Sequence, residues 1–204
     1  MMKTYRVAIL GCGSRGTAAG SAYHAHPRTE VVGVCDLVRE RRDKLGDLLG
    51  VPARFEDLDE MILQTKPDIV AIPTGTEFHH DLCMRVLEHG VNIDVEKPMC
   101  VDLKQADEVM AKAREKGARV AVHHQGRTGS YMRAAGKAVQ EGRIGDIRYI
   151  YGSGKGYYGG LGLMNIGTHM INNIIKFGGH CRSVVAIGLT AGRRITPHDV
   201  LHSP

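Results

Sequence analysis

The first 124 residues alternate between short apolar runs and segments with helical periodicity. Valine and isoleucine dominate the apolar runs, which lack polar alternation, so we expect strands that are covered on both faces. A βαβα order implies a parallel sheet with right-handed crossovers, and therefore an α/β fold with a doubly wound sheet. The expected strands are Tyr5–Leu10, Val31–Cys35, Asp68–Ile72, Val91–Val95 and Arg119–Val122, and the expected helices are Ser14–His26, Leu37–Leu49, Phe78–Glu88 and Leu103–Lys116.

The pattern changes between residues 125 and 204. We expect a helix at Tyr131–Glu141, a strand at Asp146–Gly152, a helix that carries His169 and a strand-like run at 183–189. The segment GSGKGYYGGLG at 152–162 has too many glycines for a regular element, and Tyr157 within it is either a polyol contact or an incidental loop tyrosine. So few strands cannot close a sheet. We therefore expect residues 1–124 to form one domain and residues 125–204 an incomplete α/β domain with an exposed sheet edge.

Composition narrows the choice of partners. The formal charge is +5, but bases and acids alternate, as in VRERRDKLGD at 38–47, which is typical of a solvated helix face. Aromatic residues make up 5% of the chain and tryptophan is absent, which disfavours stacking on single-stranded nucleic acid. No apolar run has the length of a signal peptide or a membrane span. We expect a cytoplasmic protein that binds neither nucleic acid nor membrane.

Neither the cysteines nor the paired histidines predict a metal site. The five cysteines stand singly, without CxxC spacing, so we expect reduced thiols and neither disulfides nor zinc. Adjacent strand residues point to opposite faces, and no spaced carboxylate joins His79-His80 or His123-His124. The second pair stands at the expected domain junction, where an approach to substrate and ordinary packing are equally open.

The first expected strand runs directly into a glycine-rich loop, GCGSRG. Gly11 permits a tight turn, Gly13 lets the backbone approach a pyrophosphate, and Gly16 lets the next helix pack close to the strand. The amino end of that helix favours an anion because of its free N–H groups and its dipole. For Arg15, a phosphate contact and a solvated side chain are both open. For the whole loop, the alternative is a tight turn without a ligand. The expected cofactor contacts are Gly11, Cys12, Gly13, Ser14, Arg15 and Gly16.

Asp36 ends the second expected strand at the ribose position, about 20 residues beyond the loop. Its carboxylate can accept hydrogen bonds from the ribose hydroxyls and would repel a 2′-phosphate. We therefore expect NAD in preference to NADP. Arg39 and Arg41 stand close enough in the sequence to weaken that preference.

Two further segments carry candidate chemistry. One strand ends in Glu96-Lys97-Pro98, where the lysine stands on a stiff backbone that can be cis; a functional lysine and an exposed one are equally open. In the expected last helix, one face is polar and centred on a histidine, which suits either a site or a hydrogen-bonded core histidine. That face holds Asn165, His169, Asn172 and Asn173.

Taken in order, these motifs resemble the glucose–fructose oxidoreductase/inositol dehydrogenase (Gfo/Idh/MocA) family over nearly the whole chain. The resemblance implies an N-terminal Rossmann sheet and a C-terminal α/β domain whose open sheet carries substrate and often forms homo-oligomers. The motifs are GCGSRG, Asp36, Pro73 with His79, EHG at 88–90, EKP at 96–98, Arg127, EGRIGDI at 141–147 and Gly167-Thr168-His169.

The resemblance also assigns roles to residues. Lys97 and His169 match the catalytic lysine and histidine of the family. Such an imidazole can take a hydroxyl proton near neutral pH, and an ammonium favours the alkoxide that develops. The expected cofactor contacts beyond the loop and Asp36 are Pro73, Thr74, His79, Glu96 and Lys97, and the expected substrate contacts are Asn165, Asn172, Arg127 and Tyr157.

The chain departs from the family pattern in two places. Asn165 replaces an aspartate that the family often has four residues before the histidine, and an amide cannot supply negative charge to an imidazolium. Family members are also considerably longer, so we expect a fragment or a short form. The function we expect is NAD-dependent oxidation of a sugar, cyclitol or polyol. The alternatives are an NAD-using glycoside hydrolase of the same family and a dinucleotide-binding fragment with little or no catalysis.

Overall fold

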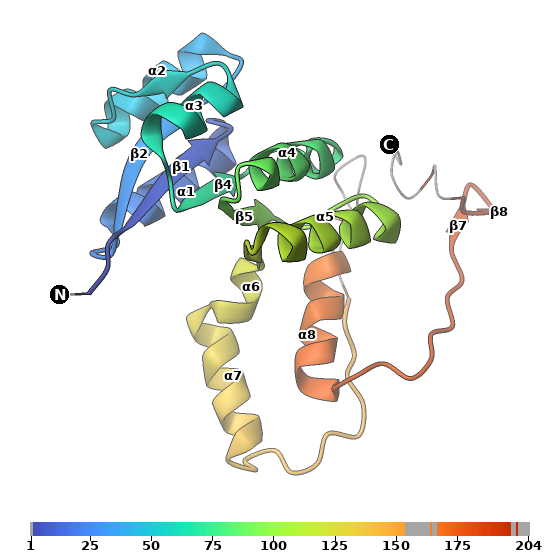
Figure 1. Ribbon diagram of the computed structural model, residues 1–204. Helices are drawn as coiled ribbons and strands as arrows, with labels where there is room; N and C mark the ends of the chain where they lie inside the picture. The colour runs from blue at the N-terminus through green and yellow to red at the C-terminus, as the bar shows by residue number, and fades with distance from the viewer. Residues whose placement is uncertain (1, 154–163, 165–166, 197–198, 200–204) are drawn as a thin grey trace. The chain divides into compact units, whose positions relative to one another are not determined.

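The computed structural model describes residues 2–153, 164, 167–196 and 199 (Figure 1). Two compact units divide the chain, Met1–His123 and His124–Pro204. Within the described ranges, no helix combines the length and apolar character needed to cross a membrane.

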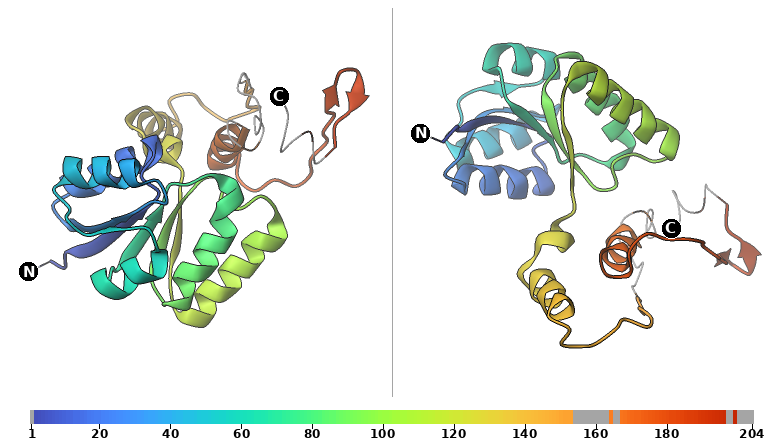
Figure 2. Two further views of the ribbon diagram at one scale, coloured as in Figure 1. Left: turned by 90° about the horizontal axis from the view of Figure 1, so that it is seen from above. Right: turned by 60° about the horizontal axis from the view of Figure 1, so that its bottom comes forward.

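The first unit is a six-stranded parallel sheet with helices on both faces (Figure 2). The strand order is β3-β2-β1-β4-β5-β6, so the chain winds outward in both directions from a switch point between β1 and β4. This arrangement confirms the doubly wound α/β fold. The strands are β1 Tyr5–Leu10, β2 Thr29–Cys35, β3 Arg54–Phe55, β4 Ile69–Ile72, β5 Asn92–Glu96 and β6 Val120–His123; the helices are α1 Ser14–Ala25, α2 Arg39–Leu49, α3 Leu58–Thr65, α4 Thr76–Glu88 and α5 Leu103–Lys116.

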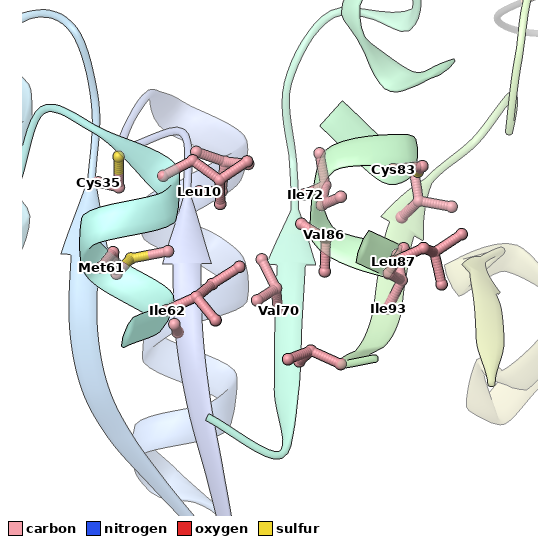
Figure 3. Close-up of a cluster of buried hydrophobic side chains, with 14 of the residues drawn as sticks. Leu10, Cys35, Met61, Ile62, Val70, Ile72, Cys83, Val86, Leu87 and Ile93 are labelled. Atoms are coloured by element: carbon pink, nitrogen blue, oxygen red, sulfur yellow. The ribbon is translucent and has the colours of Figure 1, made fainter. Parts of the chain in front are cut away.

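The sheet is apolar on both faces because successive side chains of a strand point in opposite directions. In β1, Val7 and Ile9 join a core cluster that includes Leu45 of α2. The residues between and beside them, Ala8 and Leu10, join the cluster that contains side chains of α3, α4 and α5. Figure 3 shows part of that second cluster, which is formed by side chains from both strands and helices. Burial on both faces explains why the sequence shows apolar runs in place of alternation.

One strand and one helix of the first unit were not predicted. The strand β3 has two residues, too few to show a period, and its residues Arg54 and Phe55 pair with Val34 and Cys35 of β2. The helix α3 begins after Asp57, whose side chain accepts a hydrogen bond from the Glu60 backbone N–H. An aspartate that caps the first turn in this way is a readable start signal that the sequence interpretation did not use.

In the described part of the second unit, helices are the main regular elements, joined by long irregular segments. Its elements are α6 Gln125–Thr128, α7 Ser130–Gln140, α8 Thr168–Gly178 and an antiparallel pair of two-residue strands, β7 Leu189–Thr190 and β8 Arg193–Arg194. The strand predicted at Asp146–Gly152 is wrong, and of the run at 183–189 only Leu189 belongs to a strand. A strand needs a neighbour to bond its backbone groups; the described residues supply none to Asp146–Gly152, and in the second run a neighbouring strand pairs with Leu189 alone. Tyr157 and Asn165 lie outside the described residues.

Candidate functional site

The structure gives a different role to each of the three glycines in the loop after β1. Gly11 has a φ of +106°, which favours glycine, and a Cβ there would lie 2.8 Å from Cγ2 of Thr74. A Cβ on Gly16 would lie 1.9 Å from the carbonyl oxygen of Gly11, so only glycine lets α1 start so close to the loop. A Cβ on Gly13 would meet nothing within 4 Å. Gly11 and Gly16 therefore serve the fold, while Gly13 leaves the face of the loop open.

The amino end of α1 is free to receive an anion. Gly13 is its N-cap and Ser14 its first residue; no side chain caps the helix, and its first turn holds no acid. The first N–H groups of a helix lack intrahelical partners, and the helix dipole adds positive potential there. The loop and helix start together fit a pyrophosphate.

Asp36, which follows β2, is fixed at the far side of this loop. Its Oδ2 accepts a hydrogen bond of 2.7 Å from the backbone N–H of Cys12, and its Oδ1 accepts one of 2.8 Å from that of Val38. Both oxygens are therefore oriented by backbone that the sheet itself positions. The second lone pair of each carboxylate oxygen can still accept hydrogen bonds from ribose hydroxyls.

A pocket of about 570 Å³ joins these features. It runs along the carboxyl ends of β1, β2 and β4, where open α/β sheets bind ligands. Oγ1 of Thr74 is buried and has no hydrogen-bond partner among the described residues, so it can donate to a bound molecule. These features fit a dinucleotide. Of the predicted contacts, the pocket wall holds Gly11, Gly13, Ser14, Arg15, Asp36, Pro73 and Thr74.

Five predicted contacts do not line that pocket: Cys12, Gly16, His79, Glu96 and Lys97. Cys12 is buried and contributes its backbone N–H to Asp36, and Gly16 packs against the loop. Glu96 accepts hydrogen bonds at Oε1 from Nε of Arg15 (3.1 Å) and at Oε2 from the backbone N–H of Lys97 (3.2 Å). The guanidinium NH2 group of Arg15 also pairs with Glu96. Arg15 is therefore neither purely solvated nor only a phosphate ligand, because it ties the loop to the end of β5.

Lys97 stands at the end of β5 with a cis bond to Pro98. Burial lowers the pKa of Lys97 from its ordinary value, and the nearby charge of Arg15 acts in the same direction, while Glu96 opposes both. A lysine whose ammonium is partly desolvated is better suited to stabilise a developing oxyanion than a fully hydrated one.

His79, on α4, connects two loops from inside the protein. The side chain is fully buried; Nδ1 lies 2.9 Å from the carbonyl oxygen of Pro98 and Nε2 lies 3.1 Å from that of Thr74. The ring thus positions the loops after β4 and β5, which carry Thr74 and Lys97. A direct contact between His79 and cofactor stays a prediction.

Asp94 of β5 has partners that the sequence did not reveal. Its neighbours Ile93 and Val95 point into the core cluster beneath α4 and α5, so Asp94 points to the opposite face. There the hydroxyl of Tyr23 donates a hydrogen bond of 2.7 Å to Oδ2, and Nδ1 of His123 lies 3.6 Å from the same oxygen. The pKa of His123 is raised by its contact with Asp94. The acid thereby joins α1 to β6.

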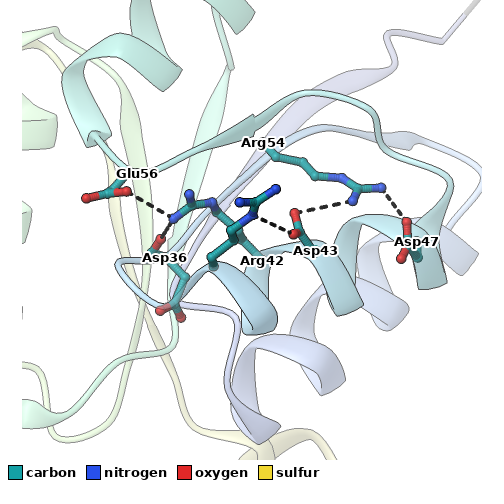
Figure 4. Close-up of polar contacts among 7 residues, drawn as sticks. Asp36, Arg42, Asp43, Asp47, Arg54 and Glu56 are labelled. Carbon is teal, nitrogen blue, oxygen red and sulfur yellow. Dashed lines mark hydrogen bonds and ion pairs between the residues drawn. The ribbon is translucent and has the colours of Figure 1, made fainter.

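A charged group behind Asp36 was also missed (Figure 4). Nη1 of Arg42 donates to the backbone carbonyl of Asp36 at 2.9 Å and lies 3.3 Å from Oε2 of Glu56. Glu56 lines the pocket, as does Arg41. A second group on the same helix joins Arg54 to Asp43 (3.4 Å) and Asp47 (2.5 Å). Arg42 and Glu56 stand 14 residues apart and meet because β3 pairs with β2.

In the second unit, His169 lines a pocket of about 400 Å³. Its ring packs edge-on against His124, with centroids 5.5 Å apart. Asn173, one turn further along α8, lines the same pocket, and its Oδ1 is buried without a hydrogen-bond partner among the described residues. Gln125 and Tyr131 are further polar lining residues that were not predicted. A polar pocket around an imidazole suits a hydroxyl-rich molecule.

Two predicted substrate contacts lie together beside that pocket. Nη1 of Arg127 donates to Oδ1 of Asn172 at 2.8 Å, and neither residue lines the pocket itself. The helical spacing placed Asn172 and Asn173 near His169, but the sequence interpretation chose Asn172 alone. In the structure it is Asn173 that faces the pocket.

The sheet, the glycine loop and the position of Asp36 are those of a dinucleotide-binding Rossmann domain. Residues 5–124 match the model of the Gfo/Idh/MocA oxidoreductase family, described as an oxidoreductase family with an NAD-binding Rossmann fold. The chain belongs to this family.

Known proteins with related sequences or structures carry several activities. The D-glucoside 3-dehydrogenase of Escherichia coli K12 is 28% identical over 182 residues, which cover 82% of this chain and 52% of the relative. The glycosyl hydrolase family 109 protein 1 of Akkermansia muciniphila is 28% identical over 153 residues (71% of this chain, 32% of the relative). KijD10, a 3-ketoreductase from Actinomadura kijaniata solved with TDP-benzene and NADP, superposes with a TM-score of 0.74 at 25% identity (87% and 57% of the chains). The chain spans about half the length of the first of these relatives, and less of the second.

Proposed function

We propose that the protein is an NAD-dependent oxidoreductase that removes a hydride from a hydroxyl-bearing carbon of a sugar, cyclitol or related polyol. The observation that carries this proposal is the carboxylate of Asp36, held by two backbone N–H groups at the ribose end of the pocket. Hydroxyls at the ribose 2′ and 3′ positions can donate to it, whereas a 2′-phosphate is repelled. Family membership and the sugar-active relatives support the substrate class.

In this proposal the loop and Asp36 bind the dinucleotide, which supplies the hydride acceptor when bound. The ammonium Nζ of Lys97 stabilises the oxygen of the reacting hydroxyl as it becomes negative. An imidazole nitrogen of His169 takes the hydroxyl proton as the carbon–hydrogen bond breaks. Gln125, Tyr131 and Asn173 line the pocket around His169 and orient the other hydroxyls of the substrate.

The cofactor preference is tested by titrating NAD and NADP at equal ionic strength. We expect tighter binding of NAD. The Asp36→Ser variant should narrow the difference, because it weakens the ribose contacts and relieves the repulsion. NADP binding as tight as NAD binding to the unaltered chain would refute the preference.

A second candidate is the NAD-using hydrolysis of glycosides, favoured by the relative that is named as a glycosyl hydrolase. Such an enzyme oxidises a substrate carbon only transiently, so NADH does not accumulate. A panel of polyols and aryl glycosides separates the two activities. Accumulation of NADH with a polyol supports the dehydrogenase, and release of the aryl group without NADH supports the hydrolase. Binding of NAD without either product supports a dinucleotide-binding fragment.

A further inference from the structure

The ribose end of the dinucleotide pocket carries two carboxylates, and the second one has no role in the function proposed above. Glu56 follows β3 and lines the pocket together with Asp36 and Arg41. Its Oε2 lies 3.3 Å from Nη1 of Arg42, whose guanidinium also supports the backbone carbonyl of Asp36 (Figure 4). An arginine is thus held directly behind the acid that receives the ribose.

We propose that Glu56 is a second determinant of the preference for NAD over NADP, because it keeps Arg42 engaged and adds negative charge to the pocket wall. This inference rests on the proposed binding of NAD. It assigns Arg42 as a positioning residue for Asp36 in the unaltered protein and as a latent phosphate ligand once the carboxylates are removed.

The burial of the two partners supports this division of roles. The side chain of Arg42 is 16% exposed and that of Glu56 is 67% exposed, so the arginine is confined while the glutamate is the end of the pair that can leave. A guanidinium binds phosphate oxygens with parallel N–H donors, and it binds a carboxylate in the same way. A 2′-phosphate and Glu56 therefore compete for the same donors.

This competition predicts that removal of Glu56 has a large effect on the cofactor preference only when Asp36 has also been removed. With Asp36 removed alone, Arg42 stays paired with Glu56, and the pocket wall keeps one negative charge. With Glu56 removed alone, Asp36 still repels a phosphate and still accepts the ribose hydroxyls. Only the loss of both acids lets the guanidinium of Arg42 turn to a 2′-phosphate.

The experiment measures dissociation constants of NAD and NADP for Asp36→Ser, Glu56→Gln and the double variant. The readout is the ratio of the two constants, in which a general loss of binding cancels. Asp36→Ser should shift the ratio toward NADP by roughly tenfold, and Glu56→Gln should add about another tenfold in that background, in line with an ionic contact to phosphate. In the presence of Asp36, Glu56→Gln should shift the ratio by less than about threefold.

Two controls test the assignment. Asp47→Asn removes a carboxylate of similar exposure, 73%, which belongs to α2 and pairs with Arg54 in place of Arg42. Added to Asp36→Ser, it should change the ratio by less than about twofold. Arg42→Gln added to the double variant should abolish the second gain, and Arg41→Gln should leave it.

The outcomes separate this inference from the proposed function. If Asp36→Ser leaves the ratio unchanged, the proposed ribose contact is wrong. If Asp36→Ser shifts the ratio but Glu56→Gln adds no more than Asp47→Asn, the role of Glu56 is refuted and the NAD assignment stands. A second gain that survives Arg42→Gln and disappears with Arg41→Gln refutes the role of Arg42.

Discussion

At the scale of single residues, the glycine loop separates folding from binding. A methyl group on Gly16 would meet the Gly11 carbonyl, whereas one on Gly13 would point into open space. We expect Gly16→Ala to lower the free energy of unfolding by about 2 kcal/mol or more, as strain in a tight contact does. Gly13→Ala should change stability by less than about 1 kcal/mol and yet weaken NAD binding, because its methyl would lie on the open face of the loop, where we propose that the pyrophosphate binds. Denaturant unfolding and NAD titration of both variants check this pair; equal losses of stability would contradict it.

Lys97 is the residue whose loss should affect chemistry more than binding. In the proposed mechanism its charge stabilises the developing alkoxide, and Lys97 does not line the dinucleotide pocket. In a preparation with measurable dehydrogenase activity, Lys97→Ala should reduce kcat roughly a hundredfold or more while the Kd of NAD changes little. Steady-state kinetics and titration measure the two effects. An unchanged kcat would refute the catalytic role of Lys97.

At the scale of elements, Tyr23 fastens α1 to β5 through Asp94. Removing its hydroxyl leaves the Asp94 carboxylate, whose side chain is 15% exposed, with one fewer donor. Tyr23→Phe should therefore cost about 1.5–3 kcal/mol of unfolding free energy, the range for hydrogen bonds to charged groups. Tyr5→Phe is the control. The Tyr5 ring, which phenylalanine keeps, makes the described contact, with Nζ of Lys3 5.0 Å from its centroid. We expect less than about 0.5 kcal/mol there.

The contact between Asp94 and His123 of β6 should make the free energy of unfolding depend on pH. The pKa of His123 is raised by its contact with Asp94, so the folded state binds the proton more tightly than the unfolded state. The stabilisation is fully present below the unfolded pKa, which is about 6.5, and it is lost as the pH rises through the folded pKa. Between about pH 6 and pH 8 the unaltered protein should lose more stability than His123→Gln. Unfolding at a series of pH values measures this; parallel profiles would exclude the contribution. The effect is small, because His123 is 40% exposed.

At the scale of the whole molecule, the dinucleotide pocket belongs to one unit. All of its lining residues lie between Leu10 and Arg85, within Met1–His123. NAD at about 100 times its Kd should raise the unfolding free energy of that unit by about 2.7 kcal/mol. Hydrogen exchange should show protection at residues 10–16 and 34–38 and little in α7 and α8. Equal protection of both units would mean that the second unit also takes part in binding.

The sequence predicted the first unit well for a physical reason. Strands buried on both faces leave long apolar runs, and the loop after β1 has chemistry that only a few arrangements satisfy. The sequence did not predict contacts between segments that the sheet brings together. Arg42 meets Glu56, and Tyr23 meets Asp94, only after the strands pair. In the second unit, an apolar pattern at Asp146–Gly152 predicted a strand, but a pattern cannot supply the partner that a strand requires.

The five free thiols give the protein a built-in reporter. Cys181 is exposed, whereas Cys12 of the phosphate loop is buried and burial raises its pKa to about 12. An alkylating reagent can reach exposed Cys181 in the folded protein, whereas it reaches Cys12 only during a local opening of the loop. Cys35, Cys83 and Cys100 are buried as well, so the label is located by peptide mass spectrometry, and its rate of appearance on Cys12 times that opening without an introduced probe. A dinucleotide bound at the loop should slow the labelling of Cys12.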